Sequence, residues 1–176
     1  MLAAITFAGL VACGPSIDPK FVEEVKKTNE ELAGKKAAFD ATSAKLGEMS
    51  YEKMEKMLKD SLGEKTYADA EKDSAFKAEM AALKSEYEAV TGEVNNLTTT
   101  YSSKLGEANG FVEGLTTGKI KPEEANKQWG ELKTAIEGSV AANDEASKKL
   151  DSWAEKFKNQ LNTAKEKFKK GAKKGK

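Results

Sequence analysis

Few residues of this chain could carry out covalent or acid–base chemistry, and one of them has an unusual position. Cys13 is the only cysteine among 176 residues, and it lies between the apolar run 2–12 and Gly14-Pro15. The chain contains no histidine and no arginine. Ser-His-Asp and Cys-His arrangements, imidazole metal sites and bidentate arginine clamps are therefore excluded. A single thiol also cannot form an internal disulfide or a thiolate zinc site.

The carboxylates do not suggest an acid–base site either. Pairs such as Glu23-Glu24 and Glu123-Glu124 are adjacent in the sequence, so on a helix their side chains point to different faces. We find no nucleophile–base pair and no set of metal ligands. We therefore expect a protein that is not an enzyme and that holds no cofactor or metal.

The sequence that ends in Cys13 resembles the lipobox of bacterial lipoproteins. The run 2–12 is too short to span a bilayer as a helix, which takes about 20 residues, but its length suits the apolar core of a secretory signal. It leads into Leu10-Val11-Ala12-Cys13. The resemblance implies that a diacylglycerol is attached to the Cys13 sulfur, that residues 1–12 are removed, and that the new N-terminus is acylated.

The same resemblance implies a location. Several acyl chains, such as palmitate, anchor a protein stably to a membrane. Gly14 follows the cysteine, where an aspartate would favour the inner membrane, so we expect the outer membrane, on its periplasmic face or at the surface. The alternative is that Cys13 is a buried structural cysteine on an apolar N-terminal helix.

The charge of the chain is unevenly distributed. Its 29 lysines balance its 29 acidic residues, but residues 163–176 contain seven lysines and one glutamate and carry a charge of +6. Such a basic tail indicates an anionic partner, for which we expect another envelope protein or an anionic cell-wall polymer and not a nucleic acid. The alternative is a solvated terminus that binds nothing. The candidate contact residues are Lys165, Lys167, Lys169, Lys170, Lys173, Lys174 and Lys176.

The spacing of apolar residues predicts three long helices, at about 18–62, 67–117 and 122–169. Asp18 and Pro19 fit the start of the first, and Pro122 the start of the third. A new cap at Ser50 interrupts the first helix, and Gly63 ends it. The seam of the second helix is the clearest in the chain: Phe76, Met80, Leu83, Tyr87, Val90, Val94, Leu97, Tyr101, Lys104, Ala108, Phe111 and Leu115.

Three helices of about 70 Å joined by short connections predict an all-α fold. The expected architecture is an elongated antiparallel three-helix bundle or coiled coil, similar to a stretched spectrin-type repeat. The alternative is a four-helix bundle in which 18–48 and 50–62 fold separately. We prefer three helices because a two-residue break cannot easily reverse the chain. The expected divisions are a signal peptide at 1–12, a lipidated linker at 13–17, the bundle at 18–169 and a disordered basic tail at 170–176.

Two groups of residues have more than one interpretation. Gly106, Gly110, Gly114 and Gly118 recur every four residues, opposite Gly130 and Gly138 in the next helix. They predict either close helix contact or, as we prefer, a hairpin that is loose and exchanges its amide hydrogens quickly. The alternative is that these glycines are simply tolerated in a long helix. Met49, Met54 and Met57 form either an adaptable apolar binding patch or, as we prefer, the core of a helix junction.

Taken together, these patterns favour a non-enzymatic, lipid-anchored helical protein of the bacterial envelope. It would act as a spacer, adaptor or protein-interaction module, and it could form oligomers. One alternative is a periplasmic chaperone or carrier that binds apolar clients with an opened bundle. Another is a helical bundle that acts on membranes.

Overall fold

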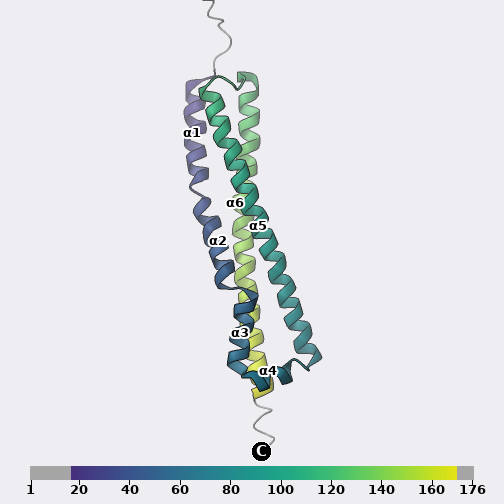
Figure 1. The fold of residues 1–176 in the computed structure, drawn as a ribbon. Helices are drawn as coiled ribbons and strands as arrows, with labels where there is room; N and C mark the ends of the chain where they lie inside the picture. The colour runs from purple at the N-terminus through teal and green to yellow at the C-terminus, as the bar shows by residue number, and fades with distance from the viewer. Residues whose placement is uncertain (1–16, 170–176) are drawn as a thin grey trace, which may run out of the picture.

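The computed structural model describes residues 17–169, which are helical almost throughout and contain no strand (Figure 1). The prediction of an all-α fold is therefore confirmed. The elements are α1 (Pro19–Ala33), α2 (Lys36–Glu48), α3 (Tyr51–Leu62), α4 (Glu64–Ala70), α5 (Ser74–Thr116), α6 (Pro122–Ala164) and the π-helical turn η1 (Lys165–Lys169).

These elements form a rod with three arms. The first arm is α1, α2 and α3 in sequence along one side, α5 returns along the rod, and α6 runs antiparallel to α5 (Figure 1). α3 continues in the direction of α2, as the three-arm arrangement requires. α5 and α6 contain 43 residues each, which gives about 65 Å of helix. We call the end where α1 begins the proximal end and the end where α6 finishes the distal end.

Local capping chemistry sets several helix starts where the sequence predicts them. The Asp18 carboxylate accepts a hydrogen bond from the Lys20 amide at 2.9 Å, and Pro19 is the first residue of α1. The Ser50 hydroxyl accepts one from the Lys53 amide at 3.3 Å and begins α3. Gly63, with a φ of 81°, ends α3 in a conformation that favours glycine.

The first arm is divided once more than the sequence suggests. α1 ends at Ala33 and α2 begins at Lys36, and Lys35 is exposed at the break between them. Gly34 weakens the helix here. In addition, the Tyr101 hydroxyl donates to the Leu32 carbonyl at 2.6 Å. A side chain that binds a carbonyl in this way interrupts the helical hydrogen-bond ladder.

The second arm begins later than predicted. The long helix starts at Ser74 and not near residue 67, because Asp73 caps it by accepting a hydrogen bond from the Phe76 amide at 3.0 Å. The residues before it form the short helix α4, which joins the distal ends of the first and second arms (Figure 1). Tyr67 and Ala70 of α4 are buried against the distal core.

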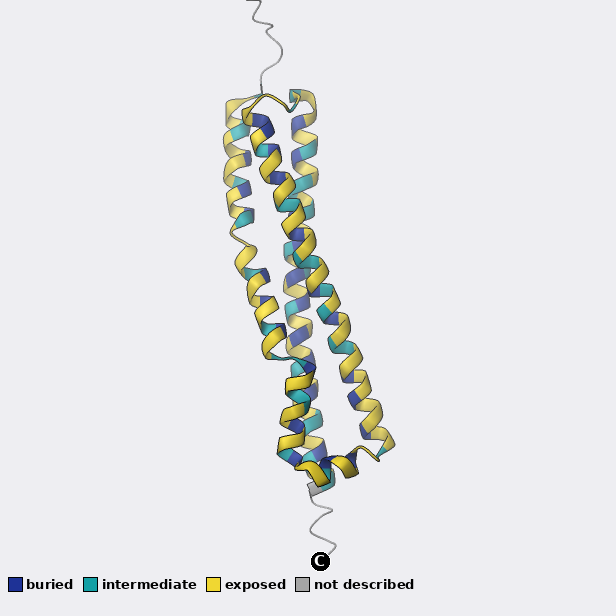
Figure 2. Cartoon of the chain, in the orientation of Figure 1, coloured by how far each residue is buried: buried dark blue, intermediate teal, exposed yellow. Residues whose placement is uncertain are grey.

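The three arms share one thin core that follows the predicted seams. Every position of the α5 seam is buried or half-buried, and the buried stripes of the three arms face one another (Figure 2). A distal cluster lies around Trp153 and Phe157, and a proximal cluster around Phe111 and Ile136. A third cluster contains Leu46, Val94 and Leu150, and Thr42, Ser139 and Asn143 are buried polar residues.

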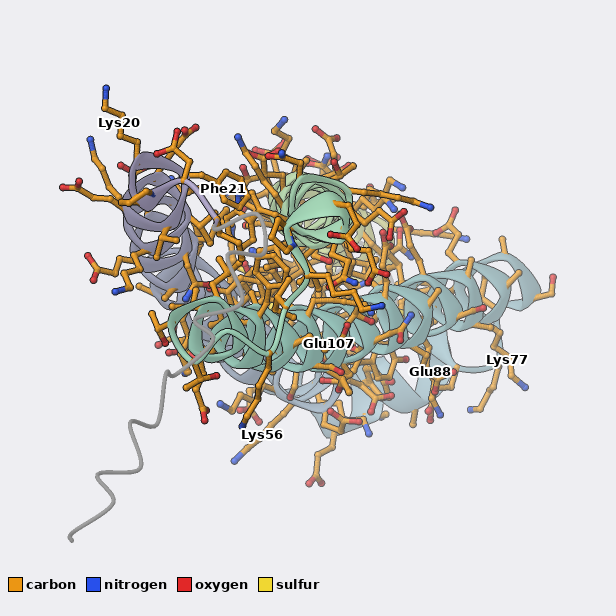
Figure 3. The ribbon with its side chains drawn as sticks, turned by 90° about the horizontal axis from the view of Figure 1, so that it is seen from above. Lys20, Phe21, Lys56, Lys77, Glu88 and Glu107 are labelled. Carbon is orange, nitrogen blue, oxygen red and sulfur yellow. The ribbon has the colours of Figure 1, made fainter. Side chains whose placement is uncertain are left out.

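Charged side chains cover the outside of the rod. Seen along the rod, Lys20 and Lys77 point outwards, whereas Phe21 lies on the inner side of α1 (Figure 3). Phe21 packs against the proximal cluster. The surface also carries ion pairs within single helices, such as Lys36–Asp40 at 2.8 Å, and exposed pairs of this kind contribute little to stability.

Candidate functional site

The residues that the sequence selects for function fall largely at the two ends of the chain. Cys13 lies outside the described residues, as do Lys170, Lys173, Lys174 and Lys176. Lys165 is half-buried at the end of α6, and Lys167 is exposed in η1. Lys169 is the last residue of η1, and its side chain is not described. The described part of the basic segment is therefore η1, at the distal end.

η1 is attached to the start of α5 by an apolar contact and an ionic contact. The ring of Phe168 meets that of Phe76 edge-on, with centroids 5.8 Å apart. The Lys167 ammonium lies 2.7 Å from a carboxylate oxygen of Asp73. Both contacts join the end of the third arm to the beginning of the second and close the distal end of the rod.

Asp73 has two partners at this junction. Its carboxylate accepts hydrogen bonds from Lys167 and from the Phe76 amide, and these bonds, the one from Lys167 first, hold the pKa of Asp73 below its usual value. Asp73 is therefore ionised at neutral pH and neutralises part of the charge of η1. As a result, Lys167 is less available to an anionic partner than the sequence suggests.

An aromatic cluster completes the distal end. The ring of Tyr67 in α4 meets the ring of Phe76 edge-on, with centroids 6.0 Å apart. Phe168 makes a separate edge-on contact with the same Phe76 ring. The Tyr67 hydroxyl donates to a carboxylate oxygen of Glu55 in α3 at 3.0 Å. Burial, together with the neighbouring Glu55, raises the pKa of Tyr67 well above its ordinary value. Tyr67 thus remains protonated at neutral pH and links α3 to α4.

The methionine group divides between core and surface. Met49 and Met54 are half-buried and pack against the distal cluster, as the preferred interpretation of a helix junction predicts. Met57 is 57% exposed on α3 and is the exception. One exposed methionine does not form the contiguous apolar patch that a binding surface needs.

The glycines of the α5–α6 hairpin mostly face open space. At Gly106, Gly110, Gly130 and Gly138, an added Cβ would have no neighbouring heavy atom within 4 Å. The interpretation as a stripe of close helix contact is wrong at these positions. Gly114 does have a close neighbour, because an added Cβ would lie 2.8 Å from the side chain of Ile120, but Ile120 belongs to the turn after α5 and not to the facing helix. That the hairpin is loose remains a prediction.

A shallow groove runs between α5 and α6 near this hairpin. Its floor includes Phe111 and Leu132, and its rim includes Lys104 and Glu107. Further along the rod, Lys149–Glu93 and Lys156–Glu86 bridge the two helices. On the rim of the groove, Glu107 pairs instead with Lys104 of its own helix at 2.8 Å. The rim charges therefore neutralise each other, and the groove has no convergent set of reactive groups.

Neither metal chemistry nor membrane spanning finds support in the part of the chain that the structure describes. Residues 17–169 contain no group of three His, Cys, Asp or Glu side chains that could hold a metal ion. Over the same residues, every helix is too short or too polar to cross a bilayer. No known protein family, curated protein or solved structure matches this chain.

Sequence reasoning missed the roles of three polar side chains. Tyr87 and Tyr101 were placed in the apolar seam, but their hydroxyls donate to carbonyls of the first arm. Asp73 was not singled out, although it caps α5 and binds Lys167. Two features of the sequence could have indicated these roles. One is a tyrosine at two seam positions that leucine could fill, and the other is an aspartate directly before Ser74.

Proposed function

We propose that this protein is a non-enzymatic, lipid-anchored spacer of the bacterial cell envelope. In this proposal Cys13 carries the lipid, the rod spans the distance, and the basic segment that begins at η1 meets an anionic partner. The outer membrane is the proposed location of the anchor. The partner is another envelope protein or an anionic cell-wall polymer.

One observation supports the proposal most strongly: the described residues begin and end at opposite ends of the rod. α1 begins at the proximal end, and η1 lies at the distal end (Figure 1). With 43 residues in each long helix, the ends are about 65 Å apart. A lipid at Cys13 would therefore hold the proximal end at the membrane and keep the lysines away from that membrane.

This separation argues for a partner in a different layer of the envelope. The attraction between a basic segment and an anionic membrane falls off within about 10 Å at ordinary ionic strength. The lysines at the distal end are several times further than this from the anchor. In this proposal, they bind something opposite the anchoring membrane.

The lipid anchor is tested by the change Cys13→Ser. We expect the wild-type protein recovered from bacterial membranes to begin at Cys13 and to carry added acyl mass. The variant is expected to keep residues 1–12, to lack the added mass and to leave the membrane fraction, because serine offers no thiol for the lipid. Intact-mass spectrometry and membrane fractionation measure both results. A wild-type protein that is soluble, uncleaved and unmodified would contradict the proposed anchor.

The anionic contact is tested by changing Lys170, Lys173, Lys174 and Lys176 together to glutamine. We expect the wild-type protein to co-sediment with purified peptidoglycan sacculi at low salt and to be released by high salt, and we expect the variant not to bind. The matched control changes four exposed lysines of the rod, Lys20, Lys26, Lys27 and Lys77, and should bind as the wild type does. Equal binding by both variants would show that the tail is not the contact.

A further inference from the structure

The first arm is fastened to the rest of the rod at two regularly spaced points. The Tyr101 hydroxyl of α5 donates to the Leu32 carbonyl at 2.6 Å, at the end of α1. The Tyr87 hydroxyl donates to the Leu46 carbonyl at 3.0 Å, at the end of α2. The two tyrosines are fourteen residues apart, and so are the two leucines. Each break in the first arm therefore has its own tyrosine on α5.

These hydroxyls add hydrogen bonds at carbonyls in the last turns of α1 and α2, and the Leu32 carbonyl also accepts one from the Lys35 amide at 3.1 Å. The last carbonyls of a helix have no amide within the helix to bind, and a buried carbonyl without a partner costs about 1–3 kcal/mol. The ring of Tyr101 also stacks on Phe39 of α2, with centroids 4.2 Å apart. One side chain thus binds the end of α1 and packs against the next segment.

The remaining contacts of α1 and α2 include imperfectly satisfied polar groups. Asn29 donates to Asn109 at 2.7 Å, and Asn143 donates to Thr42 at 3.2 Å. Both asparagines are more than nine-tenths buried, and the side-chain oxygen of each has no hydrogen-bond partner. Among the described residues these are the only two such side-chain atoms. Both lie where the first arm meets the hairpin, so separation of the arm would return both oxygens to water.

The α5–α6 hairpin has connections of its own. Lys149–Glu93 and Lys156–Glu86 link the two helices directly, and Trp153 of α6 donates to the Leu83 carbonyl of α5 at 2.7 Å. In the part of the chain that the structure describes, only Lys45–Asp151 joins α1 or α2 to the hairpin by an ion pair. α1 and α2 bury Val25, Leu32 and Phe39 in the proximal cluster, as α3 buries Tyr51, Leu58 and Leu62 in the distal cluster. α3 differs in that its Glu55 also accepts a hydrogen bond from Tyr67 of α4 at 3.0 Å.

We propose that α1 and α2, residues 19–48, form a releasable strap on the α5–α6 hairpin, with Tyr87 and Tyr101 as its latches. The pivot is the break at Met49–Ser50, beyond which α3 stays attached. Release exposes the apolar seam of the hairpin while the hairpin remains folded. Once released, α1 and α2 lose their helical structure, because isolated helices of 15 and 13 residues are at the limit of stability in water.

Hydrogen exchange on the full chain tests the strap. We expect the amides of 19–48 to exchange together, and at least tenfold faster than those of 86–104 and 139–157 in the hairpin, after correction for intrinsic rates. Tyr101→Phe and Tyr87→Phe each remove one hydroxyl and keep the ring. Each is expected to accelerate exchange in 19–48 by about fivefold to tenfold, because one hydrogen bond is lost, and to leave the hairpin rates unchanged.

The matched control is Tyr67→Phe. It removes the hydroxyl of a tyrosine in α4 that donates to Glu55 of α3, outside residues 19–48. It should leave exchange in 19–48 unchanged. The proposal is overturned if 19–48 and the hairpin exchange at equal corrected rates, which means that the rod opens as one unit. It is also overturned if either latch variant accelerates both regions equally. These results do not depend on lipidation at Cys13, so they are separate from the test of the proposed function.

Discussion

Replacing Trp153 by alanine is expected to lower the free energy of unfolding by about 3–5 kcal/mol, the usual cost of truncating a buried tryptophan. Trp153 is fully buried, and its ring contacts those of Tyr87 and Phe157, with centroids 4.9 and 5.7 Å away. Its indole N–H also donates to the Leu83 carbonyl at 2.7 Å. Urea unfolding followed by far-ultraviolet circular dichroism measures the change.

The conservative variant Trp153→Phe separates packing from hydrogen bonding. It keeps an apolar ring and loses the N–H donor, so we expect a smaller loss of about 1–2 kcal/mol. The two variants together show how much of the stability of the distal half depends on the volume of this side chain. A loss below about 1 kcal/mol for Trp153→Ala would contradict the packing described for the distal cluster, because cavities of this size cost more.

Changing Gly106, Gly110, Gly130 and Gly138 together to alanine is expected to raise the free energy of unfolding by about 2–4 kcal/mol, since each exposed helical glycine costs up to 1 kcal/mol relative to alanine. An added Cβ at each of these glycines has no neighbouring heavy atom within 4 Å, so the new methyl groups meet no obstacle. The gain comes from a smaller loss of backbone entropy on folding. Urea unfolding measures it, and hydrogen exchange should slow over residues 106–138.

Gly114→Ala is the matched control, because it makes the same chemical change where the space is filled. An added Cβ would lie 2.8 Å from Cγ1 of Ile120, so we expect a net loss of about 1–2 kcal/mol from overpacking. If the quadruple variant gave no stabilisation, the glycines would not be the cause of a loose hairpin. If Gly114→Ala were as favourable as the others, the contact with Ile120 would be wrong.

The sequence alone was sufficient for the features that depend on neighbours a few residues apart. Asp18-Pro19 begins α1, Ser50 begins α3 and Pro122 begins α6, as capping chemistry predicts. The seam from Phe76 to Leu115 lies on the buried side of α5 throughout. These features follow from backbone geometry and from the repeat of apolar residues, which act over one or two helical turns.

The tertiary structure decided the features that join residues far apart in the sequence. The Tyr101 hydroxyl binds the Leu32 carbonyl beside the break at Gly34, and η1 is attached to the start of α5 through Asp73 and Phe76. Whether a glycine has a close neighbour was also undecided, since Gly110 faces open space and Gly114 lies against Ile120 of the following turn. A seam shows which face of a helix is buried but not which atoms it meets. Those contacts are set by the rotation and register of the three arms, which only the packed bundle defines.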